Sequence, residues 1–180
     1  GTDSLALLDR LLPVYEEVVA QLAEAGAEWI QLDEPILATD TSPQELSALQ
    51  DAYTRLSAAA GNAKLLVQTA YGDVRDSYAT LISLPVAGIG LDLSARGAGN
   101  LALLEQHGFP QDKWLAAGVI DGRNIWTADL TAAMDTLEQI QQVVPADRLM
   151  VSASCSLLHV PYDVRLETEL PGEIVPWLAF

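Results

Sequence analysis

The feature that most constrains the fold is a repeated alternation of amphipathic helical segments with short apolar segments. Successive apolar segments begin roughly 20 to 35 residues apart, which is the length of one βα unit. Each is a continuous apolar run, as is typical of parallel strands that are covered on both faces. The pattern predicts an α/β fold with strands at 29–32, 65–69, 86–93, 114–120 and 149–154.

The helical segments carry recognisable start and stop signals. Apolar residues recur every three or four positions over residues 5–25, and Gly26 is placed to end that helix. Ser42, Pro43 and Glu45 have the spacing of a capping box at the start of the next helix. Further helices are predicted at 73–83, 100–107 and 128–144, and another one from Gly172 onward.

Composition limits the classes of partner. Half of the 180 residues are hydrophobic, which is enough for a core in one domain or a large piece of one. Nine basic residues against 25 acidic ones give a net charge of -16, so we expect neither nucleic acid nor a membrane as a partner. No apolar run approaches the roughly 20 residues of a membrane span.

The single cysteine and the chain ends give two further expectations. One cysteine, Cys155, cannot form an internal disulfide and fits a reducing, cytoplasmic location. The chain begins at Gly1 instead of methionine and stops within an apolar run, so we expect a fragment of a longer protein.

Polar residues follow several of the predicted strands. In a parallel sheet the carboxyl ends of the strands point to the same side, where such folds place their binding sites. We therefore expect one polar, site-like edge built from Asp33, Glu34, Gln68, Thr69, Asp92, Asp121, Arg123, Asn124 and residues 152–156.

Four motifs together carry a family resemblance: "WIQLDEPIL", "LPVAGIGLDL", "KWLAAGVIDGRNIW" and "SASCSLLHVP". The chain resembles, over essentially its whole length, the cobalamin-independent methionine synthases. Members of that family transfer a methyl group from 5-methyltetrahydropteroyl-oligoglutamate to homocysteine. The family enzyme consists of two face-to-face (β/α)8 barrels, and its catalytic zinc lies in the C-terminal one.

The resemblance implies that residues 1–180 are the latter five βα units of the N-terminal barrel, the larger part of a TIM (β/α)8 barrel. It implies partners in the remainder of that barrel and in the C-terminal barrel, and folate and homocysteine as ligands of the parent. The catalytic copy holds zinc with His and Cys two residues apart, then Glu, then a distant Cys. The corresponding positions are Gln68, Ala70, Asp92 and Cys155. Since a zinc site needs at least three strong ligands, we expect no metal and no catalytic residue in this chain, and zinc in the missing barrel.

The polar residues therefore remain ligand-facing candidates, each with a plainer alternative. Asp33 matches an aspartate that contacts the amino-acid substrate in the catalytic copy, and otherwise caps a turn or pairs with an arginine. Glu34, before Pro35, shapes the strand exit. Arg123 could clamp a carboxylate, although an internal ion pair is the favoured interpretation. Cys155 is expected to be a buried, inert thiol, and Trp126 a core or interface indole.

The functional expectation is a non-catalytic, folate-side scaffold of a methyltransferase, inactive by itself. The alternative is a stand-alone binding or assembly module derived from the barrel, and a remoter one is a corrinoid-linked methyltransferase. Five strands would leave two open sheet edges, so we expect self-association when the chain is produced alone.

Overall fold

The sheet consists of consecutive parallel strands in chain order. A computed structural model describes residues 5–179, so Gly1 and Phe180, on which the expectation of a fragment partly depends, lie outside the described residues. Within them, the sheet order is β1-β2-β3-β4-β5 and every pairing is parallel. This order confirms the predicted α/β fold and the larger part of a (β/α)8 barrel. The strands are Trp29–Asp33, Lys64–Gln68, Gly88–Asp92, Trp114–Ile120 and Leu149–Ala153.

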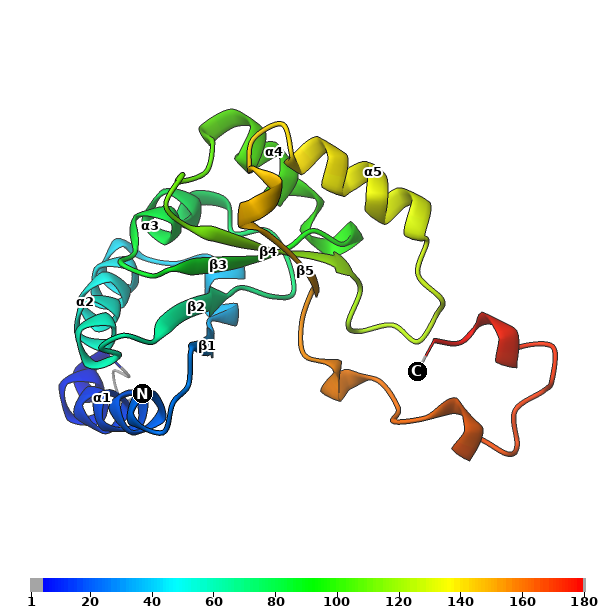
Figure 1. The fold of residues 1–180 in the computed structure, drawn as a ribbon, viewed down its shortest axis with the longest axis horizontal. Coiled ribbons are helices and arrows are strands. Elements are labelled where there is room, and N and C mark those ends of the chain that lie inside the picture. The colour runs from blue at the N-terminus through cyan, green and yellow to red at the C-terminus, as the bar shows by residue number, and fades with distance from the viewer. Residues whose placement is uncertain (1–4, 180) are drawn as a thin grey trace.

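Helices line the outer, convex side of the arched sheet (Figure 1). Their apolar side chains form one core with the outward-pointing strand residues, of which Val67, Ile89 and Leu91 are fully buried. The helices are α1 (Leu8–Glu24), α2 (Pro43–Ala59), α3 (Tyr78–Ser83), α4 (Ala98–His107) and α5 (Leu130–Ile140). None of the helices in this described range is both long and apolar enough to cross a membrane.

The predicted signals at α1 and α2 are confirmed. The Glu45 backbone N–H donates to Ser42 Oγ at 3.3 Å, and the Ser42 backbone N–H donates to Glu45 Oε2 at 2.7 Å. This reciprocal pair is the capping box, and it satisfies two of the otherwise unpaired donors of the first turn. Gly26 has φ +95°, a left-handed conformation that ends the helix without steric cost.

Two predicted helices differ from the structure. The segment 73–83 contains only a 3-10 turn, Arg75–Ser77, and the six-residue α3, because positive φ values at Tyr71 and Arg75 keep the preceding chain out of a helix. The prediction of a helix from Gly172 onward is wrong. Only a three-residue 3-10 turn, Val175–Trp177, forms there, and Pro176 removes a backbone donor from it.

The inner face of the sheet is filled by large side chains lying over glycines. Trp29 and Trp114 meet edge to face with ring centroids 6.3 Å apart. A Cβ on Gly88 would lie 2.8 Å from Leu66 Cδ1 and 3.2 Å from the Trp29 ring, so any side chain there would displace these neighbours. Alternating large and absent side chains is how the interior of a barrel is packed.

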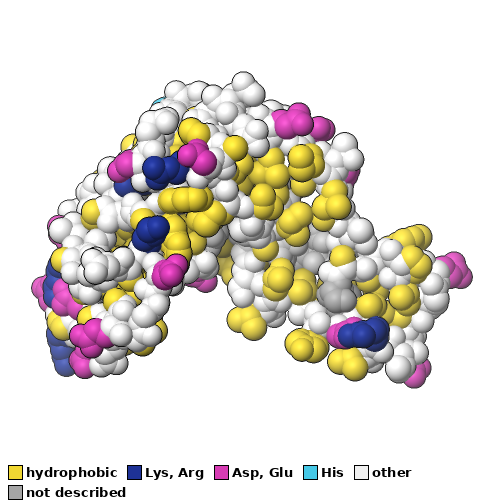
Figure 2. Space-filling view, in the orientation of Figure 1, with side chains coloured by type: hydrophobic (Ala, Val, Ile, Leu, Met, Phe, Trp, Pro, Cys, Tyr) yellow, Lys and Arg dark blue, Asp and Glu magenta, His cyan; other side chains and the backbone are white. Residues whose placement is uncertain are grey.

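Both flanks of the sheet expose apolar surface. Within the described chain, β1 and β5 each pair with one strand only. Beyond β5, residues 155–179 leave the sheet as a loop-like arm with three 3-10 turns, here named the C-terminal arm (Figure 1). Figure 2 shows hydrophobic side chains gathered in the middle of this face, around the hollow of the arch. The exposed apolar residues include Leu11, Val14, Tyr15, Val18 and Leu22 of α1, and Val151, Leu130 and Met134 near the other flank.

Candidate functional site

The carboxyl ends of the five strands form one polar edge, here named the rim, as predicted. Asp33 is in register with Gln68, and Asp92 with Gly118 of β4. Hydrogen bonds between neighbouring exits hold the rim together, such as the bond from the Glu34 N–H to the Gln68 carbonyl at 2.8 Å. The rim therefore lies where barrels of this kind place their ligands.

At the carboxyl end of β1, the Asp33 side chain is exposed and the Glu34 side chain is partly buried. Tyr53 is 1% exposed, and its hydroxyl donates to Glu34 Oε1 at 2.9 Å. Burial raises the pKa of Glu34, the Tyr53 hydrogen bond opposes that rise, and the charge of Asp33 adds to it. Asp33 itself is exposed and accepts from Gln31 Nε2 at 2.8 Å, so the expected cap or arginine pair does not form within the described residues.

In the middle of the rim, Gln68 and Asp92 are buried. Gln68 Nε2 donates to the Thr69 carbonyl at 2.7 Å, which fixes the amide over the strand end. Asp92 Oδ1 accepts from the Ser94 hydroxyl at 2.6 Å and from the Ser94 N–H at 3.0 Å. Burial raises the pKa of Asp92, and these two hydrogen bonds oppose the rise.

Cys155 is a free, buried thiol, as predicted. Burial raises the pKa of the thiol, and its Sγ lies 3.7 Å from the Ser156 carbonyl oxygen. His159 is not its partner, because His159 Nε2 is hydrogen-bonded to the Tyr71 hydroxyl at 2.9 Å. A thiol with a raised pKa and no contacting base is a poor nucleophile.

Arg123 does not form the expected internal ion pair. No carboxylate of the described residues lies within 4.0 Å of its guanidinium, whose central carbon lies 5.1 Å from the centroid of the Tyr71 ring. The sequence reasoning missed Tyr71 as a rim residue and assigned no role to His159. Their positions directly after β2 and after β5 were the signal that could have identified them.

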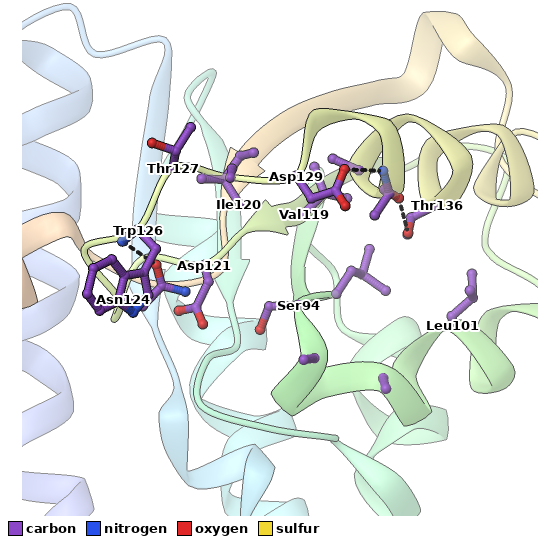
Figure 3. A pocket seen from close by; sticks show the side chains of 16 residues that line it. Ser94, Leu101, Val119, Ile120, Asp121, Asn124, Trp126, Thr127, Asp129 and Thr136 are labelled. Atoms are coloured by element: carbon purple, nitrogen blue, oxygen red, sulfur yellow. Dashed lines mark hydrogen bonds between the residues drawn. The ribbon is translucent and has the colours of Figure 1, made fainter. Parts of the chain in front are cut away.

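Asn124 and Trp126 border a cavity of about 460 Å³ between α4 and α5 (Figure 3). Asn124 Oδ1 accepts from the Trp126 N–H at 3.0 Å, which shapes the loop. The Trp126 side chain is 53% exposed, so it is not a core indole, and the alternative of an interface indole stays a prediction. Leu101, Val119 and several alanines form the apolar wall, with Ser94 and Asp121 at the polar end.

Comparison with known proteins assigns this arrangement to a family. A family model described as "Cobalamin-independent synthase, N-terminal domain" matches residues 1–145. The chain belongs to this family. Relatives named 5-methyltetrahydropteroyltriglutamate--homocysteine methyltransferase are 49% identical over 178 residues in Oryza sativa subsp. japonica and 46% identical over 185 residues in Mesorhizobium japonicum. These alignments cover 98% and 100% of the chain, which spans only 23% of the length of either relative.

Solved structures of cobalamin-independent synthases support the fold. A B12-independent methionine synthase from Shewanella sp. W3-18-1, in complex with selenomethionine, has a TM-score of 0.63 at 21% identity. The comparison covers 86% of this chain and 49% of that one. A putative vitamin-B12 independent methionine synthase from Listeria monocytogenes has a TM-score of 0.58 at 17% identity, covering 87% and 50%.

The donor set of this cobalamin-independent synthase domain does not fit a zinc ion. Among residues 5–179 no group of three or more His, Cys, Asp or Glu side chains is arranged to hold a metal. Gln68 and Ala70 occupy the positions where the resemblance places His and Cys, and Asp92 is already bonded to Ser94. A neutral amide and a methyl group are not the ligands that zinc requires.

Proposed function

We propose that this chain is a non-catalytic scaffold part of a methyltransferase that moves a methyl group from 5-methyltetrahydropteroyltriglutamate to homocysteine. The observation that carries the proposal is the 46–49% identity to methyltransferases so named, over 98–100% of the chain. The rim supports it, because it combines ligand-facing polar groups with a donor set that cannot hold zinc. The catalytic zinc is accordingly assigned to the C-terminal barrel of the parent.

The domain organisation proposed for the parent follows from the exposed flanks. Residues 1–180 would be part of its N-terminal barrel, and the missing βα units would pair with the open edges of β1 and β5. They would also cover the stripe on α1 formed by Leu11, Tyr15, Val18 and Leu22. The single buried Cys155 supports a reducing compartment, and we place the parent in the cytoplasm.

The experiment compares the full reading frame with this chain alone. Each protein is incubated with 5-methyltetrahydropteroyltriglutamate, homocysteine and zinc, and methionine is measured. We expect methionine from the full protein and none from the chain. Methionine formed by the chain alone would overturn the scaffold assignment, and a full protein without activity would overturn the proposed reaction.

Sedimentation separates this proposal from a stand-alone module. A barrel part with open edges should self-associate as its concentration rises, because unpaired strand edges and apolar flanks are exposed. A compact monomer at every concentration would favour an independent domain and contradict the partial-barrel assignment.

A further inference from the structure

Three rim side chains from three separate loops form a cluster, in which Arg123 and His159 both contact the ring of Tyr71. Tyr71 follows β2, Arg123 follows β4 and His159 follows β5. The Arg123 guanidinium lies over the ring at 5.1 Å, and the His159 ring meets it edge to face with centroids 5.7 Å apart. All three residues are exposed, so the cluster faces solvent on the edge where a ligand would approach.

The backbone at this cluster is held in an unfavourable conformation. Tyr71 has φ +73°, a left-handed value that is uncommon for a bulky side chain. Such strain persists only where surrounding contacts enforce it, and it is concentrated at functional positions. Here it aims the ring so that one face meets Arg123 while the hydroxyl reaches His159.

A hydrogen bond between the Tyr71 hydroxyl and His159 Nε2 also orients the imidazole ring. When the hydroxyl donates to His159 Nε2, the neutral ring carries its proton on Nδ1 and presents that N–H as a donor. The Tyr71 ring holds the guanidinium by a cation–π contact, which leaves the planar N–H fork available.

Arg123 has no carboxylate within 4.0 Å of its guanidinium among the described residues, and the same holds for Arg10, Arg96 and Arg148. On the same rim Arg75 pairs with Asp40 at 3.2 Å, and in the C-terminal arm Arg165 pairs with Asp163. The nearest acidic neighbour in sequence, Asp121, accepts from the backbone N–H of Arg123 at 2.8 Å and lies more than 4.0 Å from the guanidinium. Within residues 5–179 the guanidinium fork therefore has no carboxylate partner and can bind an external group.

We propose that Arg123, oriented by Tyr71 and flanked by His159, binds one carboxylate group of a small-molecule ligand at the rim. A guanidinium fork matches a planar carboxylate through two parallel hydrogen bonds, and the imidazole N–H adds a donor nearby. A single carboxylate suits the cluster better than a phosphate or a polyanion, because Arg123 is the one arginine found against the Tyr71 ring among the described residues and the chain carries a net charge of -16. This assignment does not depend on methyl transfer.

The test uses glutarate as the probe and arginine side-chain NMR as the readout, at a chain concentration at which sedimentation shows no self-association. The chain has seven arginines, so selective 15N-arginine labelling gives a simple spectrum in which each Nε–H can be assigned by substitution. Titration at constant ionic strength should shift the Arg123 signal with a millimolar Kd, the strength expected of an exposed charge pair. Arg123→Lys keeps the charge but loses the fork, and it should weaken binding about tenfold.

Substitutions at the two supporting residues test the geometry. Tyr71→Phe retains the ring but removes the hydroxyl that orients His159, and His159→Gln removes the second donor, so each should weaken binding about two- to fivefold. Arg75→Gln is the matched control, since it removes an already paired rim arginine and should leave the affinity unchanged within a factor of about two.

Three results would overturn the proposal. One is equal shifts of all seven arginine signals, which would mean general screening. Another is an effect of Arg75→Gln equal to that of Arg123→Lys. The third is inorganic phosphate binding at Arg123 as tightly as glutarate, which would contradict the carboxylate class. Each result is independent of whether the full protein makes methionine.

Discussion

Removing the Tyr53 hydroxyl should destabilise the chain in a way that depends on pH. The hydroxyl donates at 2.9 Å to the partly buried Glu34 carboxylate, and Tyr53 itself is 1% exposed. Hydrogen bonds to charged groups contribute about 1.5–3 kcal/mol, and Tyr53→Phe should lose about that much at pH 7. For a chain of this size the loss corresponds to a Tm lower by roughly 3–12 °C.

The sign of the pH dependence follows from the raised pKa of Glu34. Burial raises the pKa of Glu34 above 4.5 in the folded state. Between pH 4.5 and the folded pKa, the folded protein therefore binds more protons than the unfolded chain. Stability contributed by this group is therefore fully present below 4.5 and is lost as pH rises through the folded pKa. Because the Tyr53 bond lowers that pKa, Tyr53→Phe raises it and enlarges the loss at neutral pH.

Urea unfolding followed by tryptophan fluorescence, at pH 4 and pH 7, measures both effects. The cost of Tyr53→Phe should fall to about 1 kcal/mol or less at pH 4, where a protonated carboxyl accepts a weaker bond. In a Glu34→Gln background the cost should be about 0.5–1.5 kcal/mol at both pH values, because the partner is then neutral. An equal cost at both pH values in the presence of Glu34 would refute the reasoning.

Three other perturbations have defined outcomes. Ser42→Ala breaks the capping box of α2 and should cost about 1 kcal/mol in chemical denaturation; an unchanged midpoint would contradict the cap's role. A Cβ at Gly90 would overlap the Gln68 amide oxygen, so Gly90→Ala should cost about 1–3 kcal/mol, and most of that cost should disappear in a Gln68→Ala background. Because burial raises the pKa of Cys155, its alkylation by iodoacetamide at pH 7 should be at least about tenfold slower than that of free cysteine; equal rates would show an accessible thiolate.

The order of strands and helices was predictable because each element carries its own local signal. The continuous apolar strands, the capping box at Ser42 and the stop at Gly26 are effects of neighbouring residues, and all three are confirmed. The prediction of a helix over residues 73–83 was wrong because this segment lacks such a local signal. Its apolar spacing resembles a helix, but the backbone has positive φ values at Tyr71 and Arg75, which the apolar spacing does not predict.

The site was predictable as an edge but not as a set of contacts. Parallel strands dictate that Asp33, Gln68 and Asp92 share one side of the sheet, and they do. The partner of Arg123 was wrongly expected to be an acidic residue. An acidic composition makes ion pairs frequent on average, but it does not show which side chains lie next to a given arginine. The actual neighbour, Tyr71, lies 52 positions earlier in the chain, so the spacing of residues in the sequence could not predict this contact.

The packing of the barrel interior decides where on the rim a ligand has room. Gly90 has no side chain, so the Gln68 amide lies over it, and the bond from Gln68 to the Thr69 carbonyl fixes it there. Asp92 beside it is buried and bonded to Ser94. The centre of the rim is thus filled by side chains that satisfy one another, and the free donor groups lie farther out, on the loops after β2, β4 and β5. With the centre of the rim filled in this way, the loops after β2, β4 and β5 are where a ligand would find room and free donor groups.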